Sequence, residues 1–170
     1  MTSSSCCQQQ NVKYITPMRF TPAQALALAD IPAETLRYWK KFLLPLAAKR
    51  GHAPCYTRAE ILGLIVVRRL VRDFKMDVSV LQSQADQLFA VCASVPWTQP
   101  GRRHLVVTCE GSVSAHEDLT RKQFLEPVIV FPLDIAVNEL EQRWNERERP
   151  SQLELGLPPV SIKASLGSGR

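Results

Sequence analysis

The sequence predicts a mainly α-helical N-terminal domain over residues 14–95, followed by a small α+β C-terminal module over residues 101–149. In the first segment, apolar residues recur three and four positions apart, which is the spacing of an amphipathic helix. In the second, short runs of β-branched residues indicate strands. The segment Val95-Pro96-Trp97-Thr98-Gln99-Pro100-Gly101 separates the two, because two prolines and a glycine interrupt regular structure.

The composition is that of a globular protein, because 45% of the 170 residues are hydrophobic and 22% are charged. The sequence has no run of about eighteen apolar residues, and it begins without the basic and apolar segments of a secretory signal. We therefore expect a cytoplasmic protein that does not enter a membrane. Residues 1–13, rich in Ser and Gln, and residues 150–170, rich in Pro, Gly and Ser, are expected to be flexible tails.

The positive charge is concentrated in the first half of the chain. Residues 1–80 hold 12 Lys and Arg against 5 Asp and Glu, whereas residues 81–170 hold 9 against 11. Such a division is expected if one half meets a polyanion and the other does not. Chance unevenness is the alternative, so charge alone does not decide the function.

Two short helices joined by a tight turn are predicted at the start of the N-terminal domain. Thr21 can cap the first helix, Pro22 fits its first position, and the pattern continues to Ala29. The second helix is expected from Pro32 to about Lys41. Two such helices form a candidate helix-turn-helix.

The rest of this domain is expected to hold a wing and two longer helices. Gly51 can take the positive φ of a turn, and Thr57 with Glu60 forms a capping box that starts a helix. The predicted elements are a short hairpin or wing at Lys49–His52, a helix from the capping box to Phe74, and a helix over Val78–Ala93 capped by Asp77.

The C-terminal module is expected to alternate strands and helices. Its predicted elements are a strand at Leu105–Cys109, a turn at Glu110–Ser112 into a second strand, a helix at Glu117–Leu125, a strand at Pro127–Phe131, and a helix from Leu133 to about Arg147. The last helix carries an apolar stripe: Leu133, Val137, Leu140 and Trp144. Either this stripe packs on the module's own sheet or it forms the seam of a homodimer, and these residues are our candidates for dimerisation.

No pattern in the sequence predicts catalysis. The three histidines have no neighbouring nucleophile or carboxylate in a motif that specifies geometry, and no phosphate-binding glycine loop or zinc-protease motif is present. The five cysteines form no C-x-x-C pair, and their odd number argues against a disulfide framework and against structural zinc. We therefore expect no enzyme, no metal and no cofactor.

Several basic and aromatic residues indicate a nucleic-acid contact surface. The second helix displays cationic side chains beside a tyrosine, and Arg suits bidentate contacts to guanine or phosphate. The predicted wing adds a second basic element close behind it. The candidate DNA-binding residues are Thr21, Thr35, Arg37, Tyr38, Lys40, Lys41, Lys49, Arg50, His52 and Tyr56. Arg68, Arg69 and Arg72 on the long helix are expected instead on an exposed face without this role.

The order Thr35-Leu36-Arg37-Tyr38-Trp39, Leu43-Leu44-Pro45 and Tyr56-Thr57 before a capped helix resembles the winged helix-turn-helix domain of MerR-type transcriptional regulators. The resemblance covers roughly residues 14–88. It implies that the second helix reads DNA through Arg37 and Tyr38, that Lys49–His52 is the wing, and that a homodimer binds a palindromic operator. It also implies that Tyr56 reaches the DNA backbone. The chain departs from the family pattern at Asp30, Pro32, Phe42 and Pro54, and its second half lacks the family's long coiled-coil helix.

The sequence as a whole predicts a sequence-specific DNA-binding transcriptional regulator that acts as a dimer on promoter DNA. One alternative is a phage excisionase-like factor that bends DNA. Another is an antitoxin-type protein whose C-terminal module clamps a partner while the DNA-binding domain autoregulates. RNA polymerase or another protein is then a candidate partner of that module, beside double-stranded DNA.

Overall fold

The computed structural model describes residues 18–96, 103–117, 119 and 124–148. The elements in chain order are β1 (Arg19–Phe20), α1 (Pro22–Ala29), α2 (Ala33–Trp39), α3 (Leu44–Ala47), β2 (Tyr56–Thr57), α4 (Arg58–Asp73), a 3₁₀ helix η1 (Val78–Gln84), α5 (Ala85–Ala93), β3 (His104–Thr108), β4 (Val113–His116), β5 (Val128–Pro132) and α6 (Leu133–Glu148). The expected tails and the separating segment from Trp97 on lie outside the described residues. So does most of the helix expected at 117–125, whose described residues are not helical.

Helices α1 and α2 form as the sequence predicts. Thr21 accepts a hydrogen bond from the backbone N–H of Gln24, whose side chain in turn accepts from the N–H of Thr21, so α1 starts in a capping box. Asp30 ends α1 with φ of 54°, a left-handed conformation that an aspartate adopts more readily than most residues. Helix α2 then buries Leu36 and Trp39, which lie three positions apart on one face of the helix.

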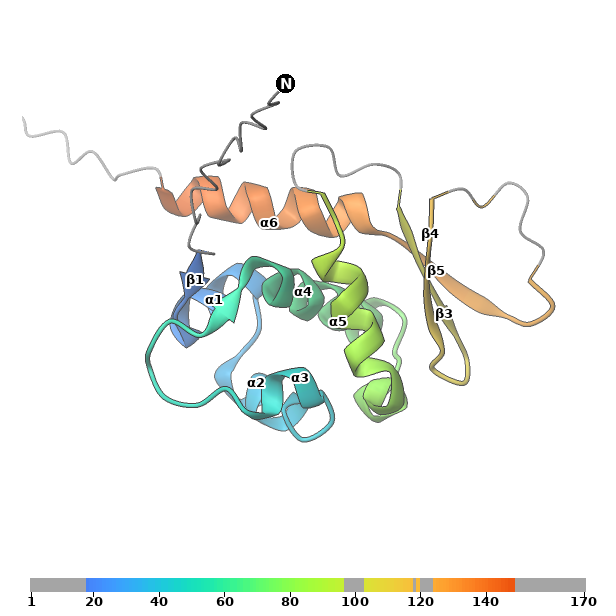
Figure 1. The fold of residues 1–170 in the computed structure, drawn as a ribbon, viewed down its shortest axis with the longest axis horizontal. Helices are drawn as coiled ribbons and strands as arrows, with labels where there is room; N and C mark the ends of the chain where they lie inside the picture. The colour runs from blue at the N-terminus through green and yellow to red at the C-terminus, as the bar shows by residue number, and fades with distance from the viewer. Residues whose placement is uncertain (1–17, 97–102, 118, 120–123, 149–170) are drawn as a thin grey trace, which may run out of the picture.

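Helix α4 is the central element, because α1, α5 and α6 all pack on it (Figure 1). Its capping box between Thr57 and Glu60 is confirmed. A helix enclosed on several sides can be apolar around most of its circumference, and the chain is buried without interruption from Ile61 to Arg68. Gly63 lies in this run directly against the ring of Phe89 from α5.

The wing expected at Lys49–His52 is not a hairpin. The strand pair on this side of the molecule is β1 with β2, in which Phe20 lies opposite Tyr56. Residues 48–55 form a loop without strand structure, although Gly51 does take the expected positive φ, 81°. The short α3 precedes this loop and is not among the predicted elements.

The helix predicted over Val78–Ala93 is present, but its first part is not an α-helix. Asp77 caps it by accepting a hydrogen bond of 2.8 Å from the N–H of Ser79. The first part, η1, is a 3₁₀ helix, and the α-helical form begins only at Ala85. The β-branched and serine residues of η1 are weaker α-helix formers than the residues of α5, which accounts for the division.

The C-terminal strands form one antiparallel sheet in the order β4-β3-β5. Leu105 lies opposite Ala115 on one side and opposite Phe131 on the other. The strands expected at 105–109 and 127–131 are therefore confirmed within a residue of their predicted ends. Gly111 takes φ of 83° in the turn between β3 and β4, close against the carbonyl of Val80.

The apolar stripe of α6 corrects our prediction of a dimer seam. Leu133, Val137 and Leu140 are fully or almost fully buried within this chain. They belong to the same hydrophobic cluster as α1, α4 and α5, and α6 packs on α4 and α1. Trp144 meets the ring of Phe20 edge-on, with ring centroids 5.1 Å apart. The stripe is thus an internal packing face, and the two expected units share one core.

Candidate nucleic-acid interface

Helix α2 and the turn after it present three polar side chains to solvent. Arg37 and Tyr38 of α2, and Lys41 in the turn, are exposed. The Tyr38 ring packs edge-on against Phe42 at 5.2 Å, and the Lys41 ammonium lies 5.9 Å from the Tyr38 ring centroid. These contacts hold an aromatic ring and a cation side by side at the C-terminal end of α2.

The Arg37 guanidinium is held in the same exposed region by Glu34, one turn earlier in α2. The two groups form an ion pair of 3.0 Å, and both side chains are 76% exposed. An ion pair this open to water contributes at most about 1 kcal/mol. A phosphate group can therefore replace the carboxylate at small cost.

The loop after α3 lies against the end of α2, because two lysines fasten it. The Lys40 ammonium donates a hydrogen bond of 2.6 Å to the carbonyl of Lys49. The Lys49 ammonium donates to the carbonyl of Cys55 at 2.6 Å and pairs with Glu60 at 2.8 Å. Arg50 and His52, at the loop tip, are exposed. The loop backbone at Lys49 is therefore held close to the C-terminal end of α2.

Lys49 is one of the sites where the structure corrects the predicted DNA-binding set. Its side chain is only 15% exposed and is engaged on two sides, so it stabilises the loop instead of reaching outward. Lys40 is half-buried and committed to the loop backbone in the same way. Fewer cations of this surface are consequently available to a ligand than the sequence suggests.

Tyr56 is a second correction, because it is fully buried and cannot reach a DNA backbone. The ammonium groups of Lys40 and Lys49 lie 5.8 Å and 5.5 Å from its ring centroid. Its hydroxyl is buried and has no hydrogen-bond partner among the described residues. Burial, with smaller effects of Cys55 and Glu60, raises the pKa of this phenol to about 12. Tyr56 therefore acts as a packing platform under the two lysines.

The two threonines of the predicted set differ in what they do. The Thr21 hydroxyl is occupied by the cap of α1, where it contacts the backbone and side chain of Gln24. Thr35 is half-buried within α2. Of the ten predicted residues, the structure thus leaves five exposed: Arg37, Tyr38, Lys41, Arg50 and His52.

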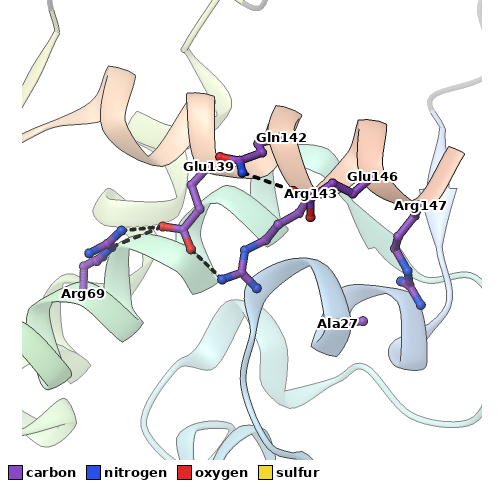
Figure 2. A pocket seen from close by; sticks show the side chains of 7 residues that line it. All are labelled: Ala27, Arg69, Glu139, Gln142, Arg143, Glu146 and Arg147. Atoms are coloured by element: carbon purple, nitrogen blue, oxygen red, sulfur yellow. Dashed lines mark hydrogen bonds and ion pairs between the residues drawn. The ribbon is translucent and has the colours of Figure 1, made fainter. Parts of the chain in front are cut away.

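The cluster of ion pairs around Arg68 and Glu139 is not predicted from the sequence. Arg68 is buried, with 8% of the residue exposed, which corrects the expectation of an exposed face. It pairs with Asp30 and with Glu139 of α6. Arg69 and Arg143 also pair with Glu139, as Figure 2 shows. The spacing did carry a signal, because Arg68 continues the buried series Ile61, Leu64.

A polar cavity of about 590 Å³ adjoins the cluster, between α1, α4 and α6 (Figure 2). The side chains that line it include Arg69, Arg143 and Arg147, but the first two already face the Glu139 carboxylate. Because Glu139, together with Asp30 and Asp73, balances the charges of the paired arginines, we assign the cluster to fold stability. Within the described ranges, no three His, Cys, Asp or Glu side chains are placed to hold a metal ion.

In the described part of the chain, none of the helices has the length and apolar character needed to cross a bilayer. Comparisons with family models, with curated proteins and with solved structures give no match for this chain.

Proposed function

We propose that this chain is a sequence-specific DNA-binding transcriptional regulator, which acts as a dimer on promoter DNA and performs no chemical step. The observation that carries the proposal is the exposed cationic and aromatic surface of α2 and the adjoining loop. This surface, hereafter the α2–loop surface, consists of Arg37, Tyr38, Lys41, Arg50 and His52.

The physical chemistry of the α2–loop surface suits a phosphate backbone. The hydrogen bonds of Lys40 and Lys49 hold the loop against the end of α2. The backbone that carries the exposed cations is therefore ordered before a ligand binds. Lys41 and Arg50 form no ion pair with any described residue, so a phosphate bound there displaces no carboxylate. Tyr38, 47% exposed, has a hydroxyl that can donate to a phosphate oxygen.

Sequence preference would come from Arg37. An exposed arginine on the second helix of a helix-turn-helix can enter the major groove and bind guanine through its O6 and N7 atoms. The turn between α1 and α2 is short, since only Asp30, Ile31 and Pro32 separate them. The resemblance of this region to MerR-type domains supports the same assignment, and the excess of basic residues in the first half of the chain agrees with it.

The test is a binding titration of the full chain with a labelled duplex taken from upstream of its own coding sequence. A duplex of equal length and unrelated sequence serves as the comparison, and both are measured at a low and a high salt concentration. We expect binding at micromolar protein or below, with preference for the upstream duplex and with affinity that falls as salt rises. No binding, or a flat salt response, would contradict the proposal.

A further inference from the structure

Strand β5 is an edge of the C-terminal sheet, and the direction of its free backbone groups can be derived. The N–H of Leu133 donates to the carbonyl of Arg103 at 2.9 Å, which extends the β3–β5 ladder by one pair. In an antiparallel ladder, hydrogen-bonded pairs alternate with non-bonded pairs. Phe131 and Ile129 therefore bond to β3, whereas the N–H and C=O groups of Val128 and Val130 point away from it. Among the described residues, no strand pairs with that side.

The composition of β5 favours pairing of this edge with another strand. The strand reads Val-Ile-Val-Phe-Pro and contains none of the charged residues that usually protect an exposed edge from pairing. Large apolar side chains are exposed at both of its ends: Phe124 and Leu125 before it, and Ile135 after it. Leu125 is completely exposed. Apolar groups gathered in this way around a free strand edge indicate an interaction surface.

The opposite edge, β4, has a different character. It carries Ser114 and His116 and ends beside Glu117. Polar and charged residues of this kind discourage edge-to-edge pairing. The two edges of one sheet thus provide a matched comparison within the same molecule.

We propose that β5 pairs antiparallel with β5 of a second copy of this chain, so that the two sheets become continuous in a homodimer. In the register that pairs the two outward-facing residues with each other, Val128 lies opposite the partner's Val130, and Ile129 lies opposite the partner's Ile129 at the two-fold axis. Pro132, which has no N–H to donate, then lies outside the bonded pairs.

A second copy is the occupant that this edge fits best, because the same short segment satisfies itself on both sides of a two-fold axis. The exposed Leu125 and Ile135 would add apolar area beside the strand pair on each copy. The interface deepens the proposed function, since a regulator on a palindromic site needs a dimer and the α6 stripe is buried. Its test uses no DNA, so failure of the dimer and failure of DNA binding are separate results.

The first experiment measures the mass of the full chain in solution by light scattering during gel filtration, at micromolar protein. Val130→Pro removes one outward N–H on the β5 edge, and Ala115→Pro removes the equivalent outward N–H on the β4 edge. Proline is tolerated at such edge positions because its missing N–H has no partner within the sheet. We expect dimers for the wild-type chain and for Ala115→Pro, and a halved mass for Val130→Pro with an unchanged circular dichroism spectrum.

The second experiment does not depend on how Val130→Pro folds. Residues opposite each other in a non-bonded antiparallel pair have Cα atoms about 4.5 Å apart, within reach of a disulfide. Ile129→Cys is therefore expected to form a covalent dimer on mild oxidation, with the 129–129 link located by peptide mapping, whereas Ala115→Cys at the other edge is not. A monomeric wild-type chain, a folded Val130→Pro dimer, or a link at 115 in place of 129 would overturn the proposed interface.

Discussion

Arg68 in the middle of α4 forms an ion pair of 2.8 Å with Asp30, the residue at which α1 turns toward α2. The same guanidinium bonds Glu139 of α6, 71 residues further along the chain. The pKa of the Asp30 carboxyl is lowered, chiefly by the hydrogen bond from Arg143 of α6 and also by the charges of Arg143, Arg68 and Arg72. The turn of the candidate helix-turn-helix is therefore held in place by the last helix of the fold.

Replacing Arg68 by alanine is expected to destabilise the whole chain. Leaving a buried charge unpaired costs about 3–5 kcal/mol. The loss should be smaller here, because Glu139, whose side chain is only 13% exposed, keeps its ion pairs with Arg69 and Arg143. Urea denaturation followed by circular dichroism measures the change. Arg72→Ala, an exposed arginine one turn away, is the control and should alter the free energy of unfolding by less than about 0.5 kcal/mol.

Replacing both Arg37 and Lys41 by alanine is expected to weaken DNA binding and to reduce its salt dependence. Loss of the phosphate contact proposed for Lys41 lowers the slope of log affinity against log salt by about 1, and loss of the guanine contact proposed for Arg37 weakens the preference for the upstream duplex. The stability of the protein should change little, because both side chains are exposed. Arg147→Ala removes a positive charge from α6, on the other side of the α1–α4 layer in Figure 1, and should leave the slope unchanged. An equal loss in that control would show that binding depends on net charge alone.

Stability is expected to fall in alkaline solution through the ionisation of Tyr56. The pKa of its phenol is raised from 10.0 to about 12 in the folded protein, so the folded chain keeps a proton that the unfolded chain releases. The stabilisation is complete below pH 10 and is lost as the pH rises from 10 toward 12. Comparing denaturation of the wild-type chain and Tyr56→Phe at pH 9 and 11 measures it. The phenylalanine variant should lose less stability between these pH values, and an identical loss would contradict the assignment.

Gly63→Ala is expected to destabilise the protein, although alanine is the better helix former by about 1 kcal/mol. A Cβ atom at this position would lie 2.5 Å from Cε1 of the Phe89 ring, so α5 would have to move away from α4. A lower unfolding temperature is the expected readout. In the double variant Gly63→Ala with Phe89→Leu, the smaller side chain should remove part of the clash. Equal destabilisation of the Phe89→Leu chain by Gly63→Ala would exclude this explanation.

The thiols of Cys92 and Cys109 are expected to differ sharply in reactivity. Burial raises the pKa of the Cys92 thiol to about 12, so almost no thiolate exists at neutral pH and reagents cannot reach the sulfur. Cys109, in the turn after β3, is exposed. Alkylation of the folded chain followed by peptide mass spectrometry should modify Cys109 and spare Cys92. Both should react in denaturant, and rapid labelling of Cys92 in the folded chain would contradict its burial.

Local patterns in the sequence predict the elements of this fold well, because the forces that start and end them act over a few residues. The capping boxes at Thr21 and Thr57 and the helical spacing after Leu133 are of this kind. The partner of a buried face is not local information. The spacing of Leu133, Val137 and Leu140 shows that α6 buries one side. The same spacing is expected whether that side packs on a sheet, on a second copy or on α4.

The same limit explains the errors at the candidate site. Lys40, Lys41 and Lys49 are alike in sequence, yet only Lys41 is exposed. The Lys40 ammonium donates to a backbone carbonyl of the loop, and the Lys49 ammonium pairs with the carboxylate of the capping residue Glu60. Folding brings both acceptors within reach. Charge counting predicts a basic surface but does not tell which cations remain available.

The position of α6 has a consequence for the order of events during synthesis. It is the last described element, ending at Glu148, and it supplies the Glu139 carboxylate to Arg68 and the Trp144 ring to Phe20. A nascent chain that has released only α1 to α5 from the ribosome lacks the Glu139 partner of Arg68. The turn between α1 and α2 would then reach full stability only after α6 has been released and has packed, so chains truncated before α6 should be less stable than the full chain.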